Sequence, residues 1–206
     1  MSQFFRVHPD NPQGRLIRGA GDILRDGGII AYPTDSGYAL GCRLDQKHAL
    51  DRIHRIRNLP PEHNFTLICR NISEVAVYAR FDDAVFRLLK ANTPGPYTFV
   101  LEATKEVPRR MLSPKRKSIG LRIPDHTIVL ALLAELDEPI MSTTLILPGE
   151  DLPMNDAEEI RLRLEKQVDL VIDGGPCGTL PTTVVDLREI PPRILREGKG
   201  DPAPFL

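Results

Sequence analysis

Short apolar runs alternate with amphipathic helical segments along this sequence, and the alternation limits the possible folds more than any other feature. Residues 16–24 place apolar side chains at helical spacing and end at Asp26-Gly27-Gly28, where a glycine can cap a helix. The next run, residues 28–32, is too short for a helix and stops at Pro33, so it predicts a buried strand. A helix followed by a buried strand is typical of α/β proteins.

The alternation continues toward the C-terminus. It predicts helices over residues 47–57, 82–90, 128–136 and 156–166. It predicts strands over residues 38–44, 66–69, 97–103, 118–123, 168–172, 182–187 and 193–196. Because simple βαβ repeats do not account for so many strands, we expect one α/β domain in which helices pack on a twisted, mixed β-sheet.

The composition fits a folded, soluble domain. Among 206 residues, 41% are hydrophobic and 27% are charged, which excludes disordered, collagen-like and coiled-coil chains. The 27 Lys and Arg nearly balance the 28 Asp and Glu, which excludes a uniformly basic nucleic-acid coat protein but not a local basic patch. We expect the three dispersed cysteines to be free thiols and, without a signal peptide or membrane-length apolar run, a cytoplasmic protein with no membrane partner.

The sequence lacks the signatures of the common active sites. It contains no phosphate-binding P-loop, no dinucleotide fingerprint, no zinc-protease helix and no G-x-S-x-G. The five histidines are scattered, and we expect them to be surface or packing residues. We therefore predict no metal site and no covalent nucleophile, so any chemistry would depend on positioning and electrostatics.

Basic residues gather in two segments. The first contains Arg52, His54, Arg55 and Arg57, and the second contains Arg109, Arg110, Lys115, Arg116 and Lys117. A solvated helix end and a solvated loop are the plain interpretations. If both segments line one concave face, they would bind phosphate groups through arginine forks and lysine charges. Arg55 and Arg57 are two residues apart, so they converge only if the predicted helix unwinds.

One arginine interrupts an apolar strand. Arg122 lies within the predicted strand 118–123, and a buried arginine needs either a structural carboxylate or an anionic ligand as its partner. The turn at residues 33–41 carries hydroxyls and two glycines between two strands. It could hold a polar ligand or could be an ordinary turn.

A series of short motifs spans most of the chain. Residues 33–41 resemble P-T-D/E-T-x-Y-G-L-G, residues 95–101 resemble G-P-x-T-x-V-L, and residues 121–126 resemble V-R-x-P-x-H. Residues 139–144 resemble P-L/I-x-S-T-S, and versions of D-G-G, P-S-T-V-V-D and I-L-R-x-G follow at residues 173–175, 181–186 and 194–198. In this order and spacing the motifs resemble those of the YrdC-like family, most of all its YciO branch.

The resemblance implies a single YrdC-like domain over residues 14–200 with a positively charged concave face, between an N-terminal segment (1–13) and a C-terminal tail (201–206). Characterised members are L-threonylcarbamoyladenylate synthases, which join L-threonine, bicarbonate and ATP for tRNA modification. By resemblance, the threonine-binding residues are Thr34, Arg122, Ser142 and Thr182. The nucleotide-binding residues are Arg55, Arg57, Ser118, Thr144 and Arg196, and ATP with Mg²⁺ is the expected cofactor.

Two departures from the family motifs bear on function. The family's K-x-R is Arg55-Ile56-Arg57, which replaces an ammonium by a planar guanidinium. The family's S-x-N is Thr144-Leu145-Ile146, and losing the hydrogen bonds of the amide costs about 1 to 3 kcal/mol.

The predicted function combines nucleotide binding with binding of double-stranded RNA or tRNA, in a role related to tRNA threonylcarbamoyladenosine biosynthesis. The alternative is an active L-threonylcarbamoyladenylate synthase, and a weak ATPase is the other enzyme that the resemblance allows. The candidate RNA-binding residues are Arg52, Arg109, Arg110, Lys115, Arg116 and Lys117. We expect a monomer or a weak dimer.

Overall fold

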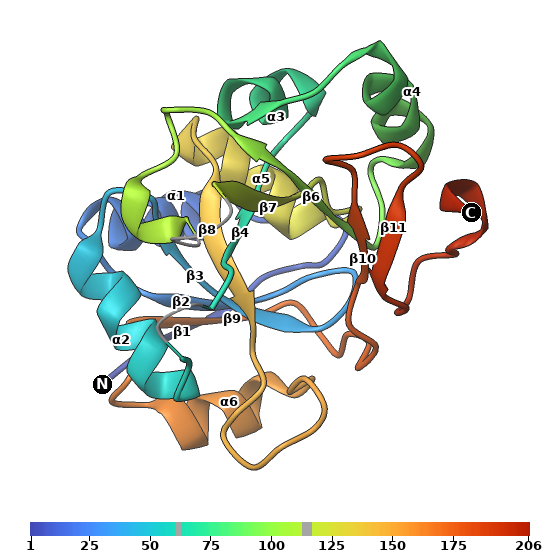
Figure 1. The fold of residues 1–206 in the computed structure, drawn as a ribbon. Coiled ribbons are helices and arrows are strands. Elements are labelled where there is room, and N and C mark those ends of the chain that lie inside the picture. The colour runs from blue at the N-terminus through green and yellow to red at the C-terminus, as the bar shows by residue number, and fades with distance from the viewer. Residues whose placement is uncertain (61–62, 113–116) are drawn as a thin grey trace.

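The computed structural model shows a single α/β domain and describes residues 1–60, 63–112 and 117–206 (Figure 1). The helices are α1 (Gly14–Arg25), α2 (Lys47–Arg57), α3 (Ile72–Tyr78), α4 (Asp83–Asn92), α5 (Thr127–Leu136) and α6 (Ala157–Leu164), with short 3₁₀ turns η1 (Arg109–Met111) and η2 (Ala203–Phe205). The strands are β1 (Gln3–Arg6), β2 (Ile30–Pro33), β3 (Tyr38–Arg43), β4 (Thr66–Ile68), β5 (Ala79–Arg80), β6 (Tyr97–Ala103), β7 (Ser118–Arg122), β8 (Ile140–Thr144), β9 (Leu170–Asp173), β10 (Thr183–Asp186) and β11 (Arg193–Arg196).

The strands form one sheet in the order β1-β9-β2-β3-β8-β4-β7-β6-β10-β11, and β5 pairs with β6. The pairs β1/β9, β2/β9, β4/β7 and β6/β10 are parallel, whereas β2/β3, β3/β8, β4/β8, β6/β7 and β10/β11 are antiparallel. The predicted mixed sheet is therefore confirmed.

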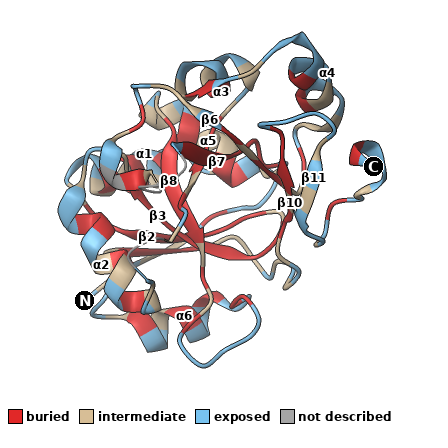
Figure 2. Ribbon diagram, in the orientation of Figure 1, coloured by how far each residue is buried: buried red, intermediate tan, exposed pale blue. Residues whose placement is uncertain are grey.

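Both faces of the sheet are covered, and most of the residues in its strands are buried (Figure 2). Along β2, Ile30 and Tyr32 join one apolar cluster while Ala31 joins the other, as expected from the alternation of side chains along a strand. The first cluster contains the buried faces of α1 and α5, which pack against each other. The second contains those of α2, α4 and α6.

The chain ends also belong to this domain. The segment 1–13 contributes β1, which pairs in parallel with β9 at the edge of the sheet. In the tail 201–206, Phe205 is buried and packs edge-on against Tyr97 and Phe99 of β6.

Four of the described strands and helices were not predicted from the sequence, among them the two-residue strand β5. Besides β1, the structure shows the central strand β8 and the short helix α3. In β8 the polar residues Ser142, Thr143 and Thr144 break the apolar pattern by which a buried strand is normally found. Helix α3 spans only 7 residues, and its start is fixed by Asn71, whose side chain accepts a hydrogen bond from the Glu74 backbone N–H at 2.9 Å.

Candidate functional site

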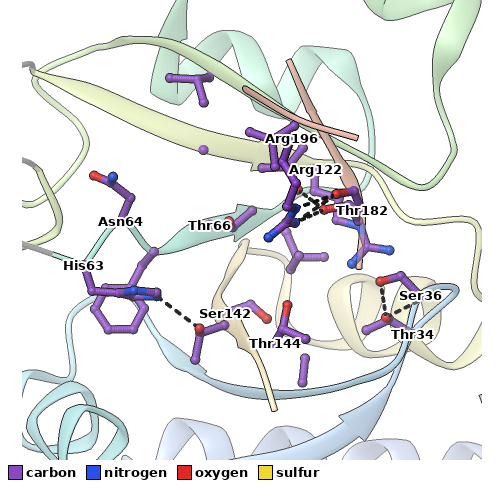
Figure 3. A pocket seen from close by; sticks show the side chains of 18 of the residues that line it. Thr34, Ser36, His63, Asn64, Thr66, Arg122, Ser142, Thr144, Thr182 and Arg196 are labelled. Carbon is purple, nitrogen blue, oxygen red and sulfur yellow. Dashed lines mark hydrogen bonds between the residues drawn. The ribbon is translucent and has the colours of Figure 1, made fainter. Parts of the chain in front are cut away.

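A cavity of about 330 Å³ lies against one face of the sheet. Its lining comes from β3, β8, β4, β7, β6, β10 and β11, which are consecutive neighbours in the sheet, so the sheet wraps around it. Because strand side chains alternate between faces, Ser118 and Arg122 of β7 point to the same, cavity side, and Gly120 between them also lines the cavity. Figure 3 shows His63 and Asn64 on one side of the cavity, with Arg122, Arg196 and Thr182 across from them.

Arg57 enters the cavity from the last turn of α2. Its Nε donates to the backbone carbonyl of Ile146 at 2.7 Å, and its Nη1 donates to Oγ1 of Thr143 at 2.8 Å. Burial lowers the pKa of Arg57 below its ordinary value. No described residue accepts a hydrogen bond from Nη2.

Arg196, on β11, is held in a similar way. Its Nε and Nη2 donate to the carbonyl of Thr182 at 3.1 and 2.9 Å, and Nη2 also reaches Oγ1 of Thr182 at 3.2 Å. Burial and then the nearby Arg122 charge lower the pKa of Arg196. Within the described part of the chain, Nη1 is unpartnered.

Arg122 has a structural carboxylate as its partner. Its Nη2 pairs with Oδ1 of Asp35, and both side chains are almost fully buried, with exposed fractions of 7% and 10%. Oδ2 of Asp35 also accepts the Asp125 backbone N–H at 3.2 Å. Asp35 does not line the cavity, so it supports Arg122 from behind. The Nε of Arg122 is buried and has no partner among the described residues.

The hydroxyl groups around the cavity differ in the hydrogen bonds that they make within the protein. Thr34 donates to the carbonyl of Gly37 at 2.6 Å and accepts the Ser36 backbone N–H at 3.2 Å, so its hydroxyl stabilises the β2–β3 turn. Ser142 shares a 2.7 Å hydrogen bond with the hydroxyl of the buried Tyr32. Burial raises the pKa of Tyr32 to about 12.

The structure brings eight of the predicted small-molecule-binding residues together. The cavity is lined by Thr34, Arg57, Ser118, Arg122, Ser142, Thr144, Thr182 and Arg196. Arg55 is separate, because α2 continues through Arg57 and directs Arg55 outward, where its Nε donates to the Asp51 carbonyl at 3.3 Å. The backbone does not unwind at this point, so Arg55 and Arg57 do not converge.

The candidate RNA-binding residues that the structure describes, Arg52, Arg109 and Lys117, do not line this cavity. Arg52 pairs with Asp169 at 2.9 Å and donates to the Gln167 carbonyl at 2.9 Å. Arg109 and Lys117 are exposed. Lys115, Arg116 and the side chain of Arg110 lie outside what the structure describes.

Some lining residues were not predicted. Thr98 shares a 2.8 Å hydrogen bond with Thr182, and Thr143 is the acceptor that holds Arg57. His63 was expected to be a surface or packing residue, yet it lines the cavity. For Thr143, its position inside the P-L/I-x-S-T-S motif is the sequence signal that could have indicated that it lines the cavity. Nothing in the sequence around His63 indicates a position in the cavity.

The described residues also bear on the expected thiols, on metal binding and on membrane-spanning helices. No disulfide joins Cys42, Cys69 or Cys177 within the described part of the chain. No group of three or more His, Cys, Asp or Glu side chains that could hold a metal occurs within residues 1–60, 63–112 and 117–206. In the same ranges, no helix is long and apolar enough to cross a membrane.

Comparison with known proteins agrees with this fold. The Sua5, YciO and YrdC family model, described as "Telomere recombination", matches residues 22–198. The YciO protein of Escherichia coli (strain K12) is 59% identical over the full length of both chains, and a Haemophilus influenzae protein is 60% identical over the full length of both. The crystal structure of E. coli YciO superposes with a TM-score of 0.97.

A more distant structure is similar as well. Sua5 of P. abyssi in complex with L-threonine is 27% identical, with a TM-score of 0.88, and the match covers 96% of this chain and 58% of that one. The family match covers most of the chain and the full-length identity is high, so this protein belongs to the Sua5/YciO/YrdC family.

Proposed function

We propose that the cavity is the positively charged concave face of this domain and binds the phosphates of a nucleotide, with ATP and Mg²⁺ as the first candidate. The observation that supports this most directly is the set Arg57, Arg122 and Arg196 on one cavity, with Asp35 as the single carboxylate paired to any of them among the described residues. Each guanidinium keeps a terminal nitrogen that no described residue engages. Guanidinium groups pair well with phosphate oxygens.

The rest of the lining also suits a nucleotide. A volume of about 330 Å³ falls at the lower end of the range for small-molecule sites, which is about 300 to 1,000 Å³. Phe65, Ile146 and Leu195 give the cavity apolar walls on which a ring system could lie. Because no metal-binding cluster exists among the described residues, Mg²⁺ would reach the site on the phosphates of the nucleotide.

Calorimetry with ATP and Mg²⁺ tests the proposal. Arg57→Ala should weaken binding about 10-fold or more, because a hydrogen bond to a charged group contributes about 1.5 to 3 kcal/mol. Arg55→Ala is the matched control, since Arg55 lies on the same helix but faces outward, and it should leave the affinity unchanged. Absence of ATP binding by the wild type, or equal losses in both variants, would refute the proposal.

A second candidate is the complete synthase reaction. It is supported by Arg122, whose free Nη1 could hold a carboxylate, and by the L-threonine bound to the related P. abyssi Sua5. Ile146 stands where the family motif has an amide, and here it offers its backbone carbonyl to Arg57. Pyrophosphate release that requires ATP, threonine and bicarbonate together, and that is lost in Arg122→Lys, would support synthase activity. Release that does not depend on threonine would contradict it.

RNA is the proposed macromolecular partner. Support comes from the exposed Arg109 and Lys117 at the two ends of the second basic segment. Contacts to the RNA backbone predict an affinity that falls steeply as salt rises and that weakens when Lys115, Arg116 and Lys117 are replaced by Gln. Filter binding of tRNA and of double-stranded RNA at several salt concentrations measures this, and an affinity independent of salt would rule it out.

A further inference from the structure

His63 forms part of the cavity wall just before β4, across from Arg122 and Arg196 (Figure 3). Its ring packs edge-on against Phe65, with ring centroids 5.1 Å apart. His54, on α2, packs on the same phenyl ring at 5.0 Å but does not line the cavity. The two imidazoles therefore share one aromatic neighbour, and His63 is the one placed to meet a ligand.

A chain of hydrogen bonds joins His63 to Arg57. Nη1 of Arg57 donates to Oγ1 of Thr143 at 2.8 Å, and Nε2 of His63 lies 3.2 Å from the same oxygen. A guanidinium group can only donate, so the Thr143 hydroxyl oxygen accepts the hydrogen bond from Arg57. The Thr143 hydroxyl then donates its own hydrogen when that hydrogen points to Nε2 of His63. The imidazole hydrogen is then on Nδ1, and the ring is neutral.

The surroundings explain why the ring is neutral without a ligand. Burial, followed by the charge of Arg57 and by His54, lowers the pKa of His63 to about 4. Among the described residues, Arg57 and His54, both on α2, are the ionisable groups that face the ring. An anion placed beside Arg57 would offset the repulsion between that guanidinium and a protonated imidazole.

We propose that His63 is an additional phosphate-binding side chain of this cavity, and that it takes up one proton when the phosphates of a nucleotide lie beside Arg57. The proton binds at Nε2. Oγ1 of Thr143 then accepts from both Arg57 and His63, and the Thr143 hydroxyl hydrogen can turn to a phosphate oxygen. Proton uptake thus adds a positive charge and a hydroxyl donor to the site. This inference rests on the proposed nucleotide function.

Calorimetry of ATP binding at pH 6.5, in buffers with different ionisation enthalpies, counts the protons taken up. The wild type should take up about half a proton more than His63→Gln, because an imidazole returned to its ordinary pKa of about 6.5 is half protonated at that pH. Subtracting the variant removes the protons exchanged by ATP itself. His54→Gln is the matched control, since His54 shares the contact with Phe65, and it should keep the wild-type uptake.

The outcomes separate the two proposals. Equal proton uptake by the wild type and His63→Gln, with ATP bound by both, overturns the role of His63 and leaves nucleotide binding standing. Failure of the wild type to bind ATP overturns both. If His63→Gln binds too weakly for calorimetry, the ring-proton signal of His63 in the wild type can be titrated by NMR. A pKa that does not rise when ATP is added then overturns the inference.

Discussion

The buried pair of Arg122 and Asp35 makes a large loss of stability predictable from a single substitution. Asp35→Asn removes the negative charge that faces Arg122, while both side chains are at most 10% exposed. Breaking a buried pair by removing one partner costs about 3 to 5 kcal/mol, since the remaining charge is left in a poorly solvated place. We expect the lower part of that range, about 3 kcal/mol, because the amide oxygen of Asn could still accept a hydrogen bond from Arg122 or the Asp125 backbone N–H.

The chain offers a matched control for this substitution. Asp137 also pairs with an arginine, Arg70, at 2.8 Å, but its side chain is 84% exposed. Exposed pairs contribute about 0 to 1 kcal/mol, so Asp137→Asn should cost less than about 1 kcal/mol.

Urea unfolding at pH 7, followed by circular dichroism, measures both free energies. A typical domain is stable by about 5 to 15 kcal/mol, so a loss near 3 kcal/mol would shift the midpoint clearly. Similar losses for Asp35→Asn and Asp137→Asn would refute the reasoning, because burial would then not be the cause.

Two further predictions concern the support of the cavity. Gly198→Ala would place a Cβ 2.6 Å from the carbonyl oxygen of Thr182, so it should lower the melting temperature by several degrees, whereas Gly178→Ala, with its nearest neighbour at 3.9 Å, should not. Tyr32→Phe removes the buried hydrogen bond to Ser142 and should cost about 1 kcal/mol in urea unfolding at pH 7. The pKa of Tyr32 is raised from 10.0 to about 12, so the stability that its protonated hydroxyl contributes is fully present below pH 10 and is lost as the pH rises to 12. Between pH 10 and pH 12, Tyr32→Phe should therefore lose less stability than the wild type.

Periodicity was enough to predict most of the fold. Helix α2 and strands β6 and β11 have the predicted bounds. In α2 and β6 the apolar residues recur with the helix period and the strand period, respectively. Strand β8 was missed, since three polar residues face or adjoin the cavity where a buried strand would normally be apolar. The same polar residues that build the site therefore hid the strand that carries them.

The site itself was only partly predictable. The family motifs gathered residues that the structure brings together. The position of Arg122 inside an apolar strand raised the question of its partner, and the structure answers it with Asp35. The position of His63 in the cavity could not be predicted, because its hydrogen-bond partner, Thr143 on β8, is far away in the sequence. The motif likewise grouped Arg55 with Arg57, although an intact helix turns them to different sides.

The parallel pairing of β1 with β9 has a consequence for synthesis of the chain. Gln3 pairs with Leu170, and Ile30 of β2 pairs with the same residue, so one border of the sheet depends on a strand made late. At about 5 to 20 residues per second, β1 leaves the ribosome roughly 8 to 30 seconds before its partner strand exists. Until then the backbone N–H and C=O groups of β1 that face β9 have no strand partner.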